Sequence, residues 1–175
     1  MSGLNQPFTS ESEFRMQKVQ LDIFLDSLSN CGEVVSVFIK PRPPVQVRGD
    51  HAQWMREFLQ RFSPMAEQTV MGPLDVQDIR FALLHRYEFE GSLVALVHDG
   101  GCHGLNRHLP LAEVRKQVGE MLDAVFPAPF LHLWVYRFDR MDWCPWMRET
   151  TTAAGYLVWQ AERDLWWLLC VCDED

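Results

Sequence analysis

The chain has 175 residues, of which 47% are apolar and 23% charged, a composition typical of a folded domain that argues against extensive disorder. Twenty-four acidic side chains against 16 basic ones give a formal net charge of −8. Nucleic-acid binding depends on clustered Lys and Arg, so this charge argues against it. The longest uninterrupted apolar run, residues 165–172, is far shorter than the roughly 20 residues of a membrane-spanning helix.

The cysteines and the first residues of the chain predict where the protein resides. Five cysteines are an odd number, and the sequence over 1–14 is polar. Secreted proteins usually carry paired cysteines and an apolar signal peptide. We therefore expect a cytoplasmic protein with free thiols and no membrane association. We also expect a single domain over 1–175, in which residues 1–9 are flexible.

Two helices and a strand are predicted for the first part of the chain. Apolar residues recur at helical spacing over 12–29, after a serine and a glutamate with capping-box spacing. β-Branched and aromatic residues predict a strand over 33–40. A second apolar stripe predicts a helix over 50–62, which we expect Ser63-Pro64 to stop.

A β-hairpin is predicted at the centre of the chain. Residues 63–78 have no clear period, so we expect a loop with one short strand near 69–71. The runs 79–89 and 92–98 are rich in apolar residues, and Glu90-Gly91 between them suits a tight turn. These features predict two antiparallel strands.

A helix and three strands are predicted for the last part of the chain. Apolar residues at helical spacing follow Pro110 as far as residue 125. The run 130–138 alternates as a strand does, and the runs 154–160 and 165–172 predict a second hairpin. The fold class that fits these elements is α+β, with a mostly antiparallel sheet of about five to six strands and three helices packed mainly on one face.

The loop between the central hairpin and the following helix gathers most of the reactive side chains. It carries four candidate catalytic residues, His98, Cys102, His103 and His108. Cys102 is the best candidate for a nucleophile, since a neighbouring imidazole or a helix N-terminus stabilises a thiolate. The same four side chains offer zinc ligands, but adjacent Cys102 and His103 do not easily reach one ion. Free cysteines are mostly small core residues, so we favour a structural role and expect neither a metal nor a cofactor.

Aromatic residues provide the second candidate site. Trp134 and Tyr136 share one face of the 130–138 strand. The connection 139–150 adds Arg140, Trp143, Trp146 and Met147. Residues of these types dominate binding hot spots. The alternative is that they fill a thick core, which we favour for the strand residues, whereas Trp143 and Trp146 are the ones we expect to bind.

Together these patterns predict a small cytosolic binding protein without catalysis. We expect it to engage a protein partner or a small apolar ligand through the aromatic residues of the sheet and the 139–150 loop. The alternative is a cysteine-dependent hydrolase or transferase that uses Cys102 with a nearby histidine, or a metal site on the 98–108 loop.

Overall fold

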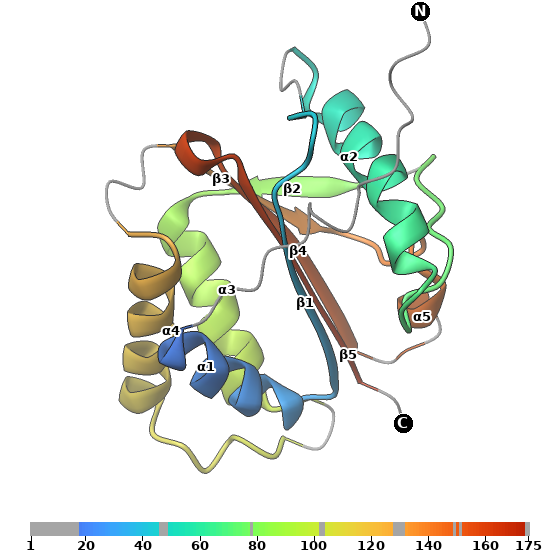
Figure 1. Cartoon of the computed structure of the whole chain (residues 1–175). Coiled ribbons are helices and arrows are strands. Elements are labelled where there is room, and N and C mark those ends of the chain that lie inside the picture. Colours follow the sequence, from blue (N-terminus) through green and yellow to red (C-terminus); the bar gives the residue numbers. More distant parts are fainter. Residues whose placement is uncertain are drawn as a thin grey trace, which may run out of the picture.

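Five antiparallel strands form one sheet that separates two layers of helices (Figure 1). The computed structural model describes residues 18–45, 49–77, 79–101, 104–127, 132–148, 150 and 152–173, so the predictions for 1–9 and for a helix start near residue 12 lie outside the described residues. The strand order across the sheet is β1-β5-β4-β3-β2. The strands are β1 (Glu33–Ile39), β2 (Phe81–Leu84), β3 (Leu133–Phe138), β4 (Thr152–Gln160) and β5 (Leu165–Asp173).

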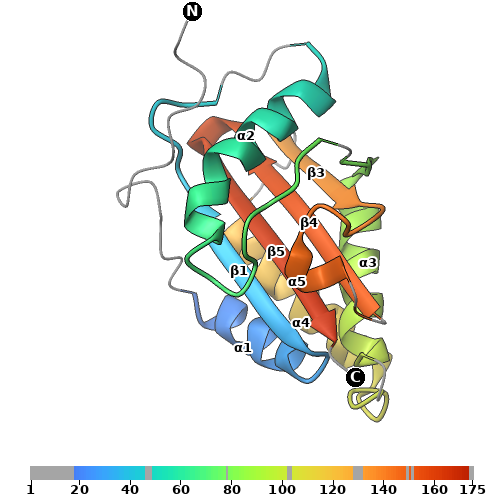
Figure 2. The same cartoon turned by 90° about the vertical axis from the view of Figure 1, so that its right-hand side faces the viewer.

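The helices cover both faces of this sheet. Three pack on one face: α1 (Val19–Ser29), α3 (Arg86–Asp99) and α4 (Leu111–Val125), with α4 touching both of the others. Figure 2 shows α2 (His51–Ala66) and the short α5 (Pro145–Arg148) in front of the opposite face. The predicted α+β class and antiparallel sheet are confirmed. No helix in the described ranges has the length and apolar character needed to cross a membrane.

The predicted hairpin over 154–172 is confirmed as β4–β5, and it lies at the centre of the core, a position that had been expected for the 79–98 run. All nine residues of β5 are buried, and a short 3₁₀ turn, Ala161–Arg163, joins it to β4. Side chains alternate between the faces of a strand. Trp166 therefore stacks on Phe58 of α2 at 4.3 Å between ring centroids, whereas Trp167 stacks on Phe38 at 5.4 Å in the other core.

The prediction of a central hairpin over 79–98 is wrong in its second half. Only Phe81–Leu84 forms a strand, and residues 86–99 form α3. Phe89, Leu93 and Val97, spaced four residues apart, are all fully buried against the sheet and α4. The side chain of Glu88 accepts a hydrogen bond from the His85 backbone at 2.7 Å, which begins the helix instead of a turn.

Two further predictions are corrected around α2. The helix does not stop at Ser63-Pro64 but continues to Ala66, because Pro64 lies in the last turn, where its missing donor costs one backbone hydrogen bond. The short strand near 69–71 is absent from the structure, which has turns there. The Thr69 hydroxyl instead donates to the Ala66 carbonyl at 2.8 Å and ends the helix.

Candidate binding surface

The glycine-rich loop after α3 is organised by a buried asparagine. Asn106 is 2% exposed, and its side-chain nitrogen donates to the carbonyls of Ser27 at 2.9 Å and Val97 at 3.0 Å. Its side-chain oxygen accepts a hydrogen bond from Asn30 at 3.1 Å. Asn106 therefore satisfies backbone groups at the C-terminal ends of both α1 and α3. No local sequence pattern marks this residue, because Asn30 and Ser27 lie 76 and 79 positions away from it.

The candidate catalytic residues of this loop are only partly described. His98 lies half-buried in the last turn of α3. His108 is exposed, with its Nδ1 2.8 Å from the Leu105 carbonyl oxygen. Cys102 and His103 lie outside the described residues, so the nucleophile hypothesis stays a prediction. Within the part of the chain that the structure describes, His, Cys, Asp and Glu form no group of three that could hold a metal.

Four cysteines lie within the described residues, and all four are buried: Cys31, Cys144, Cys170 and Cys172. Burial raises the pKa of Cys31 and of Cys144 from 9.0 to about 11, and it raises the pKa of Cys170 well above its usual value. A raised pKa lowers the thiolate fraction at neutral pH, and the thiolate is the reactive form. These three thiols are therefore suited to packing rather than to nucleophilic chemistry.

The 139–150 connection contributes mainly to the core. Trp143 is 3% exposed with its ring 4.6 Å from that of Phe138, and Met147 is 1% exposed. Trp146 is half-buried, and its indole N–H donates to the Glu33 carboxylate at 2.8 Å. Arg140 is exposed and pairs with Asp142 at 2.8 Å. Only Trp146 and Arg140 of these four therefore offer side-chain surface to a partner.

His51, the first residue of α2, lies against the two candidate residues of β3, Trp134 and Tyr136. Asp50 caps α2 by accepting a hydrogen bond from the Ala52 backbone at 2.9 Å, so the helix begins at His51. The Nδ1 of His51 is hydrogen-bonded to the Tyr136 hydroxyl at 2.7 Å. The ring of His51 also lies 5.2 Å from that of Trp134. Tyr136 is fully buried, and burial raises its pKa, so its hydroxyl stays protonated.

A second apolar side chain extends this surface to the edge of the sheet. Leu83 pairs with Tyr136 in the β2–β3 ladder, so it lies on the same face as Trp134 and diagonal to it. Leu83 is 51% exposed and Trp134 is 37% exposed. We name His51, Leu83 and Trp134 the aromatic patch. Below it lie Tyr136 and Trp54, whose buried indole N–H has no hydrogen-bond partner among the described residues.

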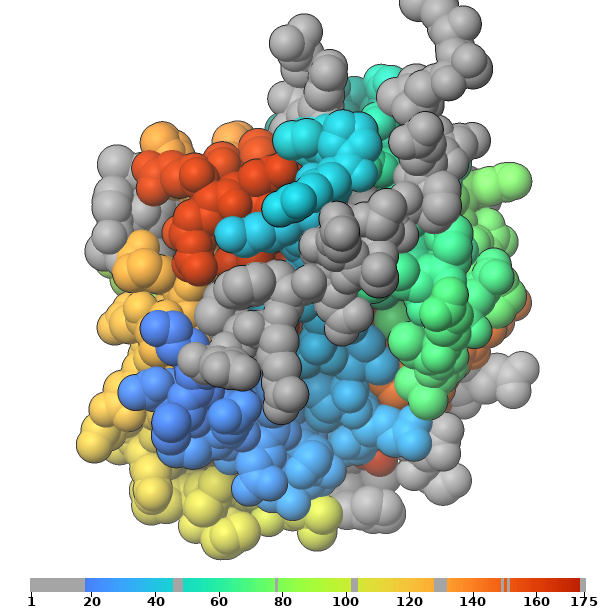
Figure 3. All heavy atoms as spheres, viewed as in Figure 1, coloured from blue at the N-terminus to red at the C-terminus, as the bar shows by residue number. Residues whose placement is uncertain are grey.

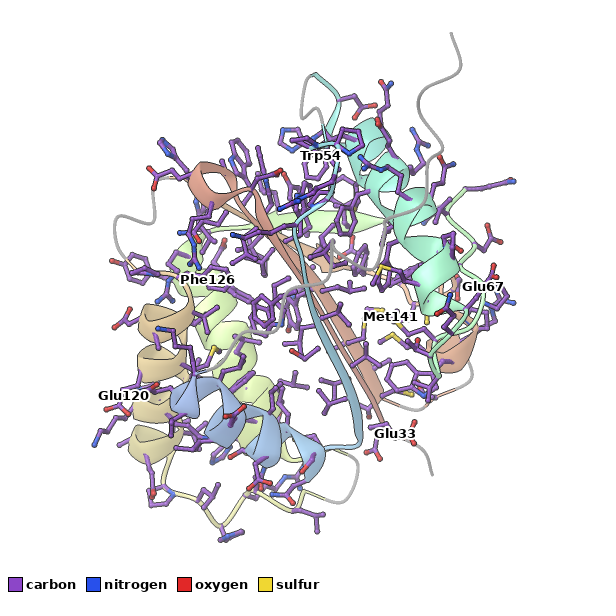
Figure 4. The ribbon with its side chains drawn as sticks, in the orientation of Figure 1. Glu33, Trp54, Glu67, Glu120, Phe126 and Met141 are labelled. Carbon is purple, nitrogen blue, oxygen red and sulfur yellow. The ribbon has the colours of Figure 1, made fainter. Side chains whose placement is uncertain are left out.

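The residues expected to bind do not form one site. Trp134 lies opposite Trp159 of β4, whereas the Trp146 carbonyl contacts Cys172, which lies opposite Ala153 of the same strand. Residues 153 and 159 are roughly 20 Å apart at about 3.3 Å per residue of strand. In Figure 4, Trp54 below the patch and Glu33, the partner of Trp146, lie at opposite ends of the molecule. The patch and the 139–150 connection are separate surfaces.

Comparison with known proteins adds no assignment to this geometry. The chain matches no protein-family model, and its sequence matches no curated protein. The candidate site therefore rests on the contacts and exposure of the aromatic patch alone.

Proposed function

We propose that this protein is a cytoplasmic binding protein without catalysis, which holds a protein partner at the aromatic patch. The main support for this proposal is that two large apolar side chains, Trp134 and Leu83, are neighbours on the sheet and are 37% and 51% exposed. The half-buried ring of His51 packs beside Trp134. Single exposed apolar residues are ordinary, but adjacent ones mark interaction surfaces. Trp, supported by a packed ring, is the residue type most often found at binding hot spots.

A protein partner suits this surface better than an enclosed apolar molecule. Between the sheet and α2, Trp166 stacks on Phe58 at 4.3 Å and on Trp159 at 5.4 Å, so rings fill the space that a ligand would need. The remaining apolar area faces outward. The hydrogen bond between His51 and Tyr136 holds the patch in place before binding, which lowers the entropy cost of association. Free thiols support a reducing compartment.

Affinity purification with matched variants tests this proposal. Trp134→Thr and Leu83→Thr remove the apolar surface while keeping a residue that suits strands. We expect each variant to reduce co-purified partner by at least about tenfold, the loss that corresponds to about 1.4 kcal/mol of binding free energy. Quantitative mass spectrometry of proteins bound to the tagged chain provides the readout.

Val70→Thr is the matched control, because Val70 is 59% exposed and lies in a turn outside the patch. We expect it to retain the partner, and we expect all three variants to keep the wild-type thermal midpoint. Equal partner recovery from wild type and both patch variants would contradict the proposal. A partner lost from Val70→Thr as strongly as from Trp134→Thr would also contradict it.

A further inference from the structure

β2 forms one edge of the sheet, and half of its backbone hydrogen-bonding groups face outward. The sheet order places β3 on one side of β2 and no described strand on the other. The Asp139 backbone N–H donates to the carbonyl of Arg80, the residue before β2, at 3.0 Å. Hydrogen-bonded and non-hydrogen-bonded pairs alternate along an antiparallel ladder. Phe81 and Leu83 therefore form the non-hydrogen-bonded pairs with β3, and their N–H and C=O groups point to the open edge.

This edge lacks the usual protection of an edge strand. Within the described part of the chain, the backbone hydrogen bonds of turns and loops include neither Phe81 nor Leu83. Natural sheets protect such edges from pairing with another chain by charged residues, proline or bulges. The sequence of β2, FALL, has no charged residue and no proline, and its register with β3 is continuous. The outward groups are therefore available to another strand.

The two residues with outward backbone groups also carry their side chains on the face of the aromatic patch. The ring of Phe81 lies edge-on to that of Tyr136 at 5.4 Å between centroids, and Leu83 lies opposite Tyr136 in the ladder. Residues directly opposite each other on neighbouring strands have side chains on one face. In a strand added antiparallel to β2, the residues whose backbone bonds to β2 therefore place their side chains over the patch.

The other edge of the sheet does not combine these features. β1 forms that edge, and the large apolar side chains exposed among the described residues include none from β1. Leu83 on β2 and Trp134 on the neighbouring strand are both among them. A strand added at β2 therefore also covers apolar surface, which a strand added at β1 does not.

We infer that β2 is the docking edge for an extended segment of the partner, which pairs with it antiparallel as an added strand of the sheet. An extended backbone supplies the acceptors and donors that match the outward groups of β2. The segment has apolar residues at every second position, because those side chains cover Leu83 and Trp134. The inference rests on the proposed function and specifies the chemistry of the partner. Two outward residues offer few hydrogen bonds, so we expect a dissociation constant of about 100 μM for a short peptide.

Backbone methylation of a peptide tests this pairing without changing the protein. The probe is a fluorescein-labelled peptide of alternating valine and threonine, KTVTVTVTK, and the readout is its fluorescence anisotropy with the full chain. Methylation of the valine nitrogens should weaken binding by more than about tenfold, because these N–H groups face β2 when valine covers the patch. Methylation of the threonine nitrogens should be tolerated, because they face away from β2.

Two results with these peptides overturn the inference. One is equal binding of the valine-methylated and threonine-methylated peptides, since only an added strand distinguishes them by the direction of their N–H groups. The other is absence of binding by the unmethylated peptide at about 1 mM, tenfold above the expected dissociation constant.

Proline substitutions test the same arrangement from the side of the protein. Leu83→Pro removes an outward N–H and should cost no ladder hydrogen bond. Ala82→Pro removes the N–H that donates to Arg137 of β3 and should lower the thermal midpoint further. Leu83→Thr is the matched control, because it loses the same leucine and keeps the N–H. We expect Leu83→Pro to bind the peptide about fivefold more weakly than Leu83→Thr. Equal binding by these two variants, both folded, overturns the inference.

The inference and the proposed function fail in different experiments. If Trp134→Thr and Leu83→Thr lose the partner but the two methylated peptides bind equally, the inference fails and the proposed function stands. If neither variant loses the partner, the proposed function fails. Sedimentation velocity tests the remaining occupant: a wild-type dimer that Leu83→Pro dissociates would assign the edge to a second copy of the chain and overturn the inference.

Discussion

Trp143 and Trp146 lie three positions apart in the sequence, yet they occupy different environments. Trp143 is 3% exposed against Phe138, whereas Trp146 is half-buried and hydrogen-bonded to Glu33. We therefore expect Trp143→Ala to lower the free energy of unfolding by about 3–5 kcal/mol, as a large cavity does. Trp146→Ala should lower it by only about 1–2 kcal/mol, mainly through the lost hydrogen bond and partial burial.

Urea unfolding of the two variants and the wild type measures both effects. Equal destabilisation by the two substitutions would mean that the burial of Trp143 does not determine its contribution. A folded Trp143→Ala with wild-type stability would return this residue to the candidates for partner binding.

The sequence predicted some site residues and could not predict others, for a physical reason. Alternation within one strand is a local pattern, so Trp134 and Tyr136 were correctly placed on one face of the sheet. How deeply each is buried depends on α2, whose His51 bonds to Tyr136 across 85 positions of sequence. Asn106 was missed for the same reason, since it reaches Ser27 across 79 positions. A hydrophobicity pattern contains no information on contacts of this range.

Two glycine-to-alanine substitutions, one within α3 and one at the residue that ends it, should change the free energy of unfolding in opposite directions. Gly100 ends the helix with φ 65°, and a Cβ atom there would lie 2.4 Å from the Asn106 backbone nitrogen. Gly100→Ala should therefore lower the free energy of unfolding by more than about 1–2 kcal/mol through strain and displacement of the loop. Gly91→Ala has open space and should raise the free energy of unfolding by about 0.5–1 kcal/mol.

Thermal unfolding of the two variants and the wild type, measured at one protein concentration, provides the comparison. Two shifts of the same sign would contradict the assignment of these glycines to different roles.

The misassigned hairpin shows where local patterns are ambiguous. The run 93–97 is entirely apolar, so it fits a buried strand and a buried helix equally well. Two residues of this segment favoured a hairpin over a helix. Gly91 resembled a turn residue, although it lies within α3, and His85 is not among the usual capping residues, although it begins the helix. By contrast, the runs 154–160 and 165–172 contain β-branched and aromatic residues, and their pairing was predicted correctly.

The stability of the whole molecule should fall at alkaline pH. The pKa values of Cys31 and Cys144 are about 11 in the folded chain against an ordinary 9.0, and those of Cys170 and Tyr136 shift in the same direction, because burial disfavours the charged forms. Between pH 9 and about 11 the folded state therefore binds more protons than the unfolded state. Stability then decreases as pH rises through this range and is unaffected by these thiols below it.

The urea midpoint, measured from neutral pH to about pH 10, follows this loss. The double variant Cys31→Ala and Cys144→Ala should show a shallower decline than the wild type, whatever its stability at neutral pH. Identical slopes for the two proteins would exclude these thiols as the source.

The position of β1 has a consequence for how the protein forms during synthesis. β1 lies at one edge of the sheet and reaches the surface between α1 and α2 (Figure 3). Its ladder partner is β5, and Glu33 lies opposite Cys172. On the ribosome, α1, β1 and α2 therefore emerge long before the strand that pairs β1 has been translated. During that interval β1 has no strand to pair with, and its apolar residues remain available to chaperones or to other nascent chains.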